Sequence, residues 1–227
     1  MLQEAAGTHA VELGLDMEAL RPHGLTWVLS KFNMKFPASD RPGWLDTVTV
    51  ETWRAGLDRF FALRDYKLMD ANGLPLVTAT SFWALFEIEK RRLAMIPDFI
   101  SATYPNAPKA GPAAKFEKIP RQTRTDHECR FVVERSDIDR NNHSNNVSYI
   151  SWALDAVPEA VWGKARLVEL DIIYRLETVL GDTIVSTIQQ EVSADEPGAL
   201  FLNHQLVREG DAKMVAQVRT HWAGRTS

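Results

Sequence analysis

The chain has a single cysteine, Cys129, among its 227 residues. One thiol cannot close an internal disulfide, so the fold has to be held together by its core, and a lone cysteine suits a reducing compartment. Cys129 lies in an alternating apolar segment, where we expect it to fill space rather than to react. Basic residues are not in excess either: the net charge of -4 argues against general affinity for nucleic acid, whose binders tend to be basic.

Long apolar runs are also missing. No run of about 18 apolar residues occurs, so the sequence contains no candidate for a membrane-spanning helix. The first residues, Met-Leu-Gln-Glu-Ala-Ala, have neither the basic start nor the apolar centre of a secretion signal. With 45% hydrophobic and 25% charged residues, the chain can bury one large core or two small ones. We therefore expect a cytoplasmic globular protein.

The first half of the sequence has the pattern of one helix followed by antiparallel strands. Residues 1–20 open with apolar side chains at helical spacing, and Gly14 is the expected end of that helix. Alternating and β-branched segments predict the strands, and an Asp-Ala-Asn-Gly turn joins the last two. The four predicted strands are 27–36, 47–53, 60–69 and 76–86.

The second half repeats this order. A helix is predicted over 145–162, followed by four strands. Between the halves, residues 101–124 contain four prolines and predict an extended surface linker. A helix with an antiparallel sheet, twice over, indicates an α+β fold made by duplication of one domain, with domains at 1–100 and 125–227. The four strands predicted in the second half are 165–177, 182–192, 199–208 and 213–222.

The two halves differ at their starts. A strand-like segment, 129–137, precedes the second helix, but no such segment precedes the first. We therefore expect the first domain to lack its leading strand, which a chain extended upstream would supply. A sheet that is short of one strand has an unpaired edge.

The densest group of polar side chains lies between strand 129–137 and helix 145–162. Seven of the eleven residues from Ser136 to Asn146 are Asp, Asn or His. Such residues favour turns and helix caps, and Asn145 or Asn146 is placed to cap the helix. A turn alone has no need of polar side chains at every second position, which point the same way if the backbone stays extended. These side chains are Asp139, Asn141 and His143.

Metal binding explains this group poorly. Asp137, Asp139 and Asn141 copy the opening of a calcium-binding loop. That loop, however, needs glycine at the position of Asn142 and a bidentate glutamate at the position of Ser148. Zinc is no better supported, because one histidine and no cysteine pair occur at ligand spacing. A histidine flanked by carboxylate and amide groups at a helix start suits polarising a carbonyl or a water molecule.

The stretch 136–152, with the pattern S-D-x-D-x-N-x-H-x-N-N-x-x-Y-I-x-W, resembles the signature of the acyl-acyl carrier protein thioesterases of bacteria and plant plastids. The Tyr-Arg-Leu-Glu sequence at 174–177 is similar to a second block of that family, and residues 64–66 and 79–83 also fit its pattern. The resemblance covers nearly the whole chain. It implies a tandem hot-dog fold, in which each domain is a sheet wrapped around one long helix. The first domain would hold the acyl chain and the second would carry the chemistry.

The resemblance also implies a reaction, the hydrolysis of the thioester of fatty acyl-acyl carrier protein, without a metal or cofactor. We expect Glu177 to act as general base on the attacking water, and His143 to orient that water or to move its proton. Asn141 would hold the water or the substrate carbonyl, assisted by N–H groups at the helix start. Asp139 would orient its neighbours, and a direct attack by Asp139 through an anhydride is the alternative. Two further residues of the signature are expected in support, Asn145 and Asn146.

Two positions depart from the family's pattern. Ser144 stands where valine is usual, and Thr178 stands where plant members commonly carry cysteine. Thr178 removes a thiol nucleophile from this position, which favours the general-base route.

The partner that the resemblance implies is an acyl carrier protein carrying a fatty acyl-phosphopantetheine. Carrier proteins are acidic, so basic clusters are the candidate docking faces. An acyl-coenzyme A thioesterase and a non-catalytic acyl-binding protein are the competing functions on this fold, and the intact set of site residues argues against the second. Both a monomer and a homodimer agree with this sequence, and so do short and long acyl chains. The basic clusters are Lys90, Arg91 and Arg92, and Lys115, Lys118, Arg121 and Arg124.

Overall fold

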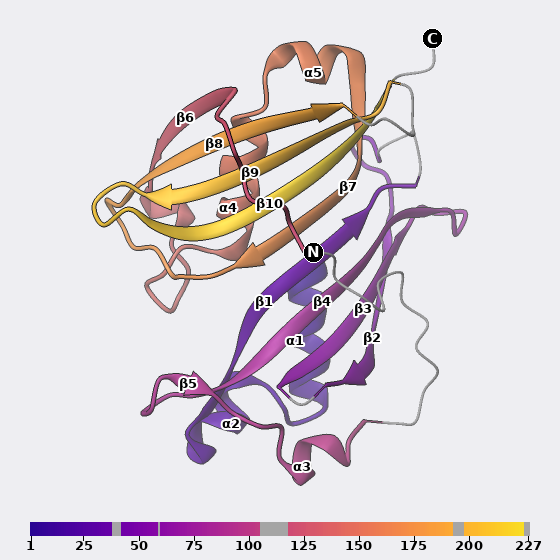
Figure 1. Cartoon of the computed structure of the whole chain (residues 1–227). Helices are drawn as coiled ribbons and strands as arrows, with labels where there is room; N and C mark the ends of the chain where they lie inside the picture. The colour runs from indigo at the N-terminus through magenta and orange to yellow at the C-terminus, as the bar shows by residue number, and fades with distance from the viewer. Residues whose placement is uncertain (38–41, 59, 105–117, 193–197, 225–227) are drawn as a thin grey trace. The chain divides into compact units, whose positions relative to one another are not determined.

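The computed structural model describes all residues except 38–41, 59, 105–117, 193–197 and 225–227 (Figure 1). The chain divides into two compact units, Met1–Phe116 and Glu117–Ser227. In the described part of the chain, no helix is both long enough and apolar enough to span a bilayer.

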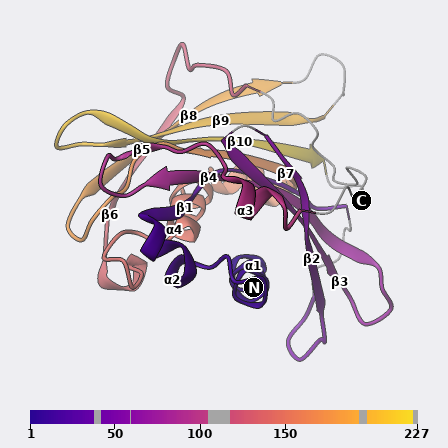
Figure 2. The same cartoon turned by 90° about the horizontal axis from the view of Figure 1, so that it is seen from below.

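Unit 1 is an antiparallel sheet with a helix against one face. Helix α1, Leu2–Glu12, lies over strands β2 and β3 (Figure 1 and Figure 2). Neighbouring strands follow the order β2-β3-β4-β1, and a two-residue strand β5 pairs with β4. The strands are β1 Leu25–Lys35, β2 Thr49–Leu57, β3 Phe61–Met69, β4 Pro75–Glu87 and β5 Arg92–Leu93. The described residues of the unit also form three short helices, α2 Met17–Leu20, η1 Arg21–His23 and α3 Asp98–Ser101.

Local sequence explains where these elements begin and end. Gly14 follows α1 with φ 64°, a left-handed conformation that glycine adopts without steric cost, as the sequence predicted. The predicted turn between β3 and β4 is also present. There Asp70 Oδ1 accepts the backbone N–H groups of Asn72 and Leu74 at 2.9 and 2.7 Å. A core cluster of buried apolar side chains contains Leu15, Leu20, Leu25, Leu85, Ala94 and Ile100.

Among the described residues, unit 2 repeats the order of the four long strands of unit 1 and adds a strand at one edge. Its antiparallel order is β7-β10-β9-β8-β6, and the first four match β1-β4-β3-β2 of unit 1 strand for strand, which confirms the predicted duplication. Within the described residues, no strand lies beside β2 where β6 lies beside β8. The strands are β6 His127–Val132, β7 Ala165–Tyr174, β8 Thr183–Val192, β9 Leu200–Arg208 and β10 Lys213–Gly224. The helices are η2 Arg135–Asp137, α4 Asn146–Asp155 and α5 Glu159–Lys164.

The helix predicted over 145–162 is in fact two helices. Apolar side chains at helical spacing bury one face of α4, including Tyr149 and Trp152. The helix stops at Ala156 because proline at 158 disfavours helical geometry at Val157, and Pro158 itself becomes the N-cap of α5.

The strand predicted over 129–137 also has other boundaries. It begins at His127, ends at Val132 and gives way to η2, and Cys129 is half-buried on this edge strand. Residues 105–117 of the predicted linker 101–124 lie outside the described residues. Its described C-terminal end packs on unit 2, where Gln122 Nε2 donates to the carbonyl of Thr187 at 2.9 Å.

A histidine is buried in the core of unit 2. His204 of β9 is fully buried, and its Nε2 lies 3.1 Å from Oγ1 of Thr220, which also accepts a hydrogen bond from Trp222 Nε1 at 2.8 Å. Burial disfavours the charged imidazole and lowers the pKa of His204 from 6.5 to about 3.

This burial predicts an acid-sensitive fold. Between about pH 6.5 and 3 the unfolded chain binds a proton at His204 that the folded chain does not, so the free energy of unfolding should fall by up to about 1.4 kcal/mol per pH unit as pH decreases. The substitution His204→Gln removes the imidazole. In urea denaturation series between pH 7 and 5, it should make the free energy of unfolding less dependent on pH, by an amount that corresponds to at most one bound proton. The matched control is His127→Gln, at an exposed imidazole of β6, which should leave the slope as it is. Equal slopes in the parent and in His204→Gln would contradict the prediction.

Candidate active site

The polar stretch before α4 forms a tight turn. Ile138 and Ser144 face each other in an isolated antiparallel bridge, and Asp139 N–H donates to the carbonyl of His143 at 2.9 Å. Asn142 takes a left-handed conformation with φ 61°, which asparagine tolerates better than most residues. The backbone is therefore not extended, so the condition under which alternate side chains point the same way is not met in this stretch.

Asp139 organises the turn. Its Oδ1 accepts the backbone N–H groups of Asn141 at 2.7 Å and of His143 at 3.4 Å. Its Oδ2 accepts a hydrogen bond from the side-chain amide of Asn141 at 3.3 Å. The structure thus brings Asp139 and Asn141 together, and Asp139 holds the backbone of His143 rather than its ring.

Asn145 caps α4, which confirms the prediction that Asn145 or Asn146 lies at the N-cap. Its Oδ1 accepts Val147 N–H at 3.0 Å, and its carbonyl accepts Ser148 N–H at 2.9 Å. These two N–H groups are therefore not free to bind a substrate oxygen. Asn146 contributes its carbonyl, which accepts a hydrogen bond from the Tyr174 hydroxyl at 3.1 Å.

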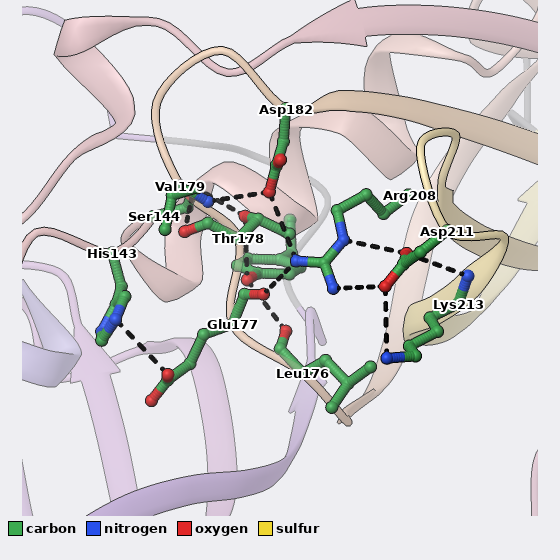
Figure 3. A network of polar contacts seen from close by, with 11 residues as sticks. His143, Ser144, Leu176, Glu177, Thr178, Val179, Asp182, Arg208, Asp211 and Lys213 are labelled. Atoms are coloured by element: carbon green, nitrogen blue, oxygen red, sulfur yellow. Dashed lines mark hydrogen bonds and ion pairs between the residues drawn. The ribbon is translucent and has the colours of Figure 1, made fainter.

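Glu177 lies in the loop after β7 and not in the strand, which ends at Tyr174. Its Oε2 is 3.4 Å from Nε2 of His143, as Figure 3 shows. The Glu177 side chain is 60% exposed and that of His143 is 38% exposed, so both are open to solvent. A carboxylate and an imidazole at this separation can share one water molecule.

Arg208 of β9 holds the loop that carries Glu177. Its Nη1 donates to the carbonyl of Glu177 at 3.2 Å and to Asp182 at 3.4 Å (Figure 3). Nε and Nη2 donate to the two carboxylate oxygens of Asp211 at 3.0 and 2.9 Å. Hydrogen bonding to Asp211, supported by Asp182, raises the pKa of Arg208, and Arg208 in turn lowers the pKa of Asp211. Asp182 also accepts a hydrogen bond from Val179 N–H at 3.0 Å. The backbone of the loop is therefore held at both Glu177 and Val179.

A buried hydroxyl cluster, made of Ser144, Tyr149 and Thr178, joins the His143 turn to the Glu177 loop. Figure 3 shows Ser144 and Thr178 between these two segments. Thr178 Oγ1 donates to Ser144 Oγ at 2.7 Å and lies 3.1 Å from the Tyr149 hydroxyl, which also donates to the carbonyl of Leu176 at 3.1 Å. Ser144 N–H donates to the carbonyl of Thr178 at 2.9 Å. Burial raises the pKa of Tyr149, so this group stays a neutral phenol.

The sequence pointed to His143 and Glu177 but not to the side chains that hold their two segments in place. Ser144 and Thr178 stood out only as two separate departures from a pattern, whereas in the fold they bond to each other. Arg208 gave no signal beyond its place near a turn, because its contacts with Glu177 and Asp182 reach a loop far away in the sequence. In the described part of the chain, no three His, Cys, Asp or Glu side chains gather as metal ligands.

The predicted docking clusters contain paired charges. Lys90 and Arg92 both bind Glu87, at 3.0 and 3.3 Å, which lowers the pKa of that carboxyl. Arg124 binds Asp126 at 2.9 Å. Lys115 lies outside the described residues. That either cluster docks a carrier protein stays a prediction.

Comparison with known proteins matches the two units to two halves of one family. A model of the acyl-ACP thioesterase N-terminal domain matches residues 1–104, and a model of the acyl-ACP thioesterase C-terminal domain matches residues 120–224. The chain belongs to the acyl-ACP thioesterase family. The resemblance inferred from the signature is thereby confirmed.

Solved acyl-ACP thioesterases share the fold. A crystal structure of an acyl-ACP thioesterase from Bacteroides thetaiotaomicron superposes with a TM-score of 0.82 at 24% identity, over 97% of this chain and 86% of that one. The 12:0-ACP thioesterase from Umbellularia californica superposes with a TM-score of 0.81 at 25% identity, over 99% of this chain and 84% of that one. The predicted tandem hot-dog fold is confirmed.

A curated plant relative is similar along the sequence. The chloroplastic palmitoyl-acyl carrier protein thioesterase of Cuphea hookeriana is 30% identical over 97% of this chain and 55% of the relative. The chain spans about half the length of the curated relatives that it matches.

The cap of α4 gives a prediction about stability. Asn145→Ala should lower the free energy of unfolding by about 1 kcal/mol, because it removes the acceptor of Val147 N–H. Asn145→Ser should restore most of the loss. The matched control is Asn146→Ala, which keeps the carbonyl that Tyr174 binds. Urea denaturation measures all three, and an equal loss in both alanine variants would contradict the capping role.

Proposed function

We propose that the protein hydrolyses the thioester of fatty acyl-acyl carrier protein to a free fatty acid and the carrier protein. The observation that carries the proposal is the 3.4 Å contact between His143 Nε2 and Glu177 Oε2, on two solvent-exposed side chains from separate loops of unit 2. Membership of the acyl-ACP thioesterase family gives the substrate class.

In the proposed mechanism Glu177 is the general base. Its carboxylate takes a proton from a water molecule, and the water oxygen attacks the thioester carbonyl carbon. The carbon–sulfur bond then breaks, and the sulfur of the carrier's phosphopantetheine leaves as a thiol. His143 orients the water and passes the proton from Glu177 to this sulfur, a task suited to an imidazole.

The carbonyl oxygen gains negative charge during the attack and needs a hydrogen-bond donor. The N–H groups of Val147 and Ser148 in the first turn of α4 are satisfied by Asn145, so we assign this task to the exposed side-chain amide of Asn141. Asp139 orients that amide through the hydrogen bond at 3.3 Å.

The contacts of Asp139 favour general-base catalysis over an anhydride. Hydrogen bonds to a carboxylate stabilise its negative charge and so weaken it as a nucleophile. Asp139 accepts three such bonds from its own turn, two at Oδ1 and one at Oδ2. Glu177, by contrast, is 60% exposed.

The two units have separate tasks in this proposal. Unit 1 holds the acyl chain and unit 2 carries the chemistry, with domains at 1–100 and 125–227. The partner is an acyl carrier protein that presents the acyl group on phosphopantetheine. We also propose a cytoplasmic location, supported by the single cysteine; the Cuphea relative is named as chloroplastic.

The proposal predicts a loss of turnover with a retained fold. Glu177→Gln and His143→Ala should each lower kcat by roughly 10²–10⁴-fold, the range for losing acid–base assistance. The measurement is hydrolysis of acyl-carrier thioesters over a ladder of acyl chain lengths. The matched control is Glu159→Gln, at an exposed glutamate in the first turn of α5, which should keep parental activity.

Two outcomes of this assay would change the assignment. Parental turnover in a folded Glu177→Gln variant would remove Glu177 from the mechanism. Faster turnover on the coenzyme A thioester than on the carrier thioester of the same acyl chain would replace the carrier protein with coenzyme A as the partner.

A further inference from the structure

We propose that the hydroxyl cluster of Ser144, Tyr149 and Thr178 is a positioning device that sets the separation of the reacting side chains of His143 and Glu177. The inference rests on the proposed function. It adds residues that touch neither substrate nor water and act only through the catalytic pair.

The first argument is adjacency along the chain. Ser144 directly follows His143, and Thr178 directly follows Glu177. Consecutive Cα atoms lie about 3.8 Å apart. Fixing Ser144 and Thr178 therefore closely restricts the backbone positions of His143 and Glu177. Three hydrogen bonds join Ser144 and Thr178. They are the side-chain bond at 2.7 Å, the bond at 2.9 Å from Ser144 N–H to the Thr178 carbonyl, and a bond at 3.4 Å from Ser144 Oγ to the same carbonyl.

The second argument is burial. Thr178 is 0% exposed and Ser144 is 7% exposed, whereas the catalytic side chains are 38% and 60% exposed. An exposed ion pair contributes little and does not hold two long side chains in place. A buried hydroxyl group that loses its hydrogen-bond partner, in contrast, raises the free energy of the folded protein. The geometry of a buried hydrogen bond is therefore rigid. The rigid part of the site is therefore the buried cluster.

The third argument is the link to α4. Tyr149 lies in this helix, and its hydroxyl contacts both Thr178 Oγ1 and the carbonyl of Leu176, on either side of Glu177 in the sequence. The Tyr149 ring packs against the rings of Trp152 and Tyr174 at centroid distances of 5.2 and 5.6 Å. The loop of Glu177 is thus anchored to the packed core of unit 2.

The test replaces the central hydroxyl with a methyl group of similar shape. Thr178→Val should lower kcat by roughly 10- to 100-fold, as expected when a catalytic group is misplaced by about 1 Å, with KM nearly unchanged. Thr178→Ser keeps the hydroxyl and should recover most of kcat. Thr220→Val is the matched control, because it also removes a buried threonine hydroxyl with two partners in unit 2, His204 and Trp222, away from the pair.

A double-mutant cycle separates positioning from simple loss of stability. If Thr178 acts through Glu177, Thr178→Val should lower kcat by less than about twofold once Glu177→Gln is present. A full additional loss in that background would overturn the inference. So would parental kcat in Thr178→Val, or an equal loss of kcat in Thr220→Val at a temperature where both are folded. Should Thr178→Val fail to fold, Ser144→Ala removes the same bond from the acceptor side and takes its place in the cycle.

Failure of the proposed function has a different signature. If the proposed function is wrong, the parent protein itself hydrolyses none of the acyl thioesters of the ladder. In that case crystal structures of the parent and Thr178→Val decide the geometry. A parental distance between His143 and Glu177 in the variant would overturn the inference, and a clear separation of the two side chains would support it.

Discussion

The hydrogen bonds between Ser144 and Thr178 are the contact on which the site of unit 2 depends. They join a turn before α4 to a loop after β7, two segments that are far apart in the chain. Each segment also carries one exposed side chain of the pair, His143 or Glu177. Because solvent screens that pair, its geometry has to come from the buried bonds beside it.

The loop of Glu177 shows how a surface segment can be made rigid without regular structure. Arg208 binds its carbonyl and the carboxylate of Asp182, while Tyr149 binds the carbonyl of Leu176. The bonds to Leu176 and Glu177 each satisfy a backbone oxygen of the loop. A general base on such a loop stays open to water and substrate while its backbone is held, which is the arrangement that preorganised catalysis requires.

Much of the fold could be predicted because its signals are local. The repeated order of helix and strands follows from apolar spacing, and the caps and turns at Gly14, Asp70 and Asn145 follow from backbone preferences of single residues. The differences between prediction and structure also have local causes. The prediction of one helix over 145–162 ignored the proline at 158. The condition of an extended backbone at 139–143 is not met because Asn142 turns the chain.

The sequence by itself determined the residue types of the site, the duplication and the family, since these depend on order and spacing along one chain. It identified His143 and Glu177 but contained no distance between them. Only the tertiary structure decided that the two meet at 3.4 Å, that Ser144 and Thr178 are partners, and that Arg208 holds the loop. The physical reason is that contacts between distant segments depend on how sheet and helix pack, which no local pattern records.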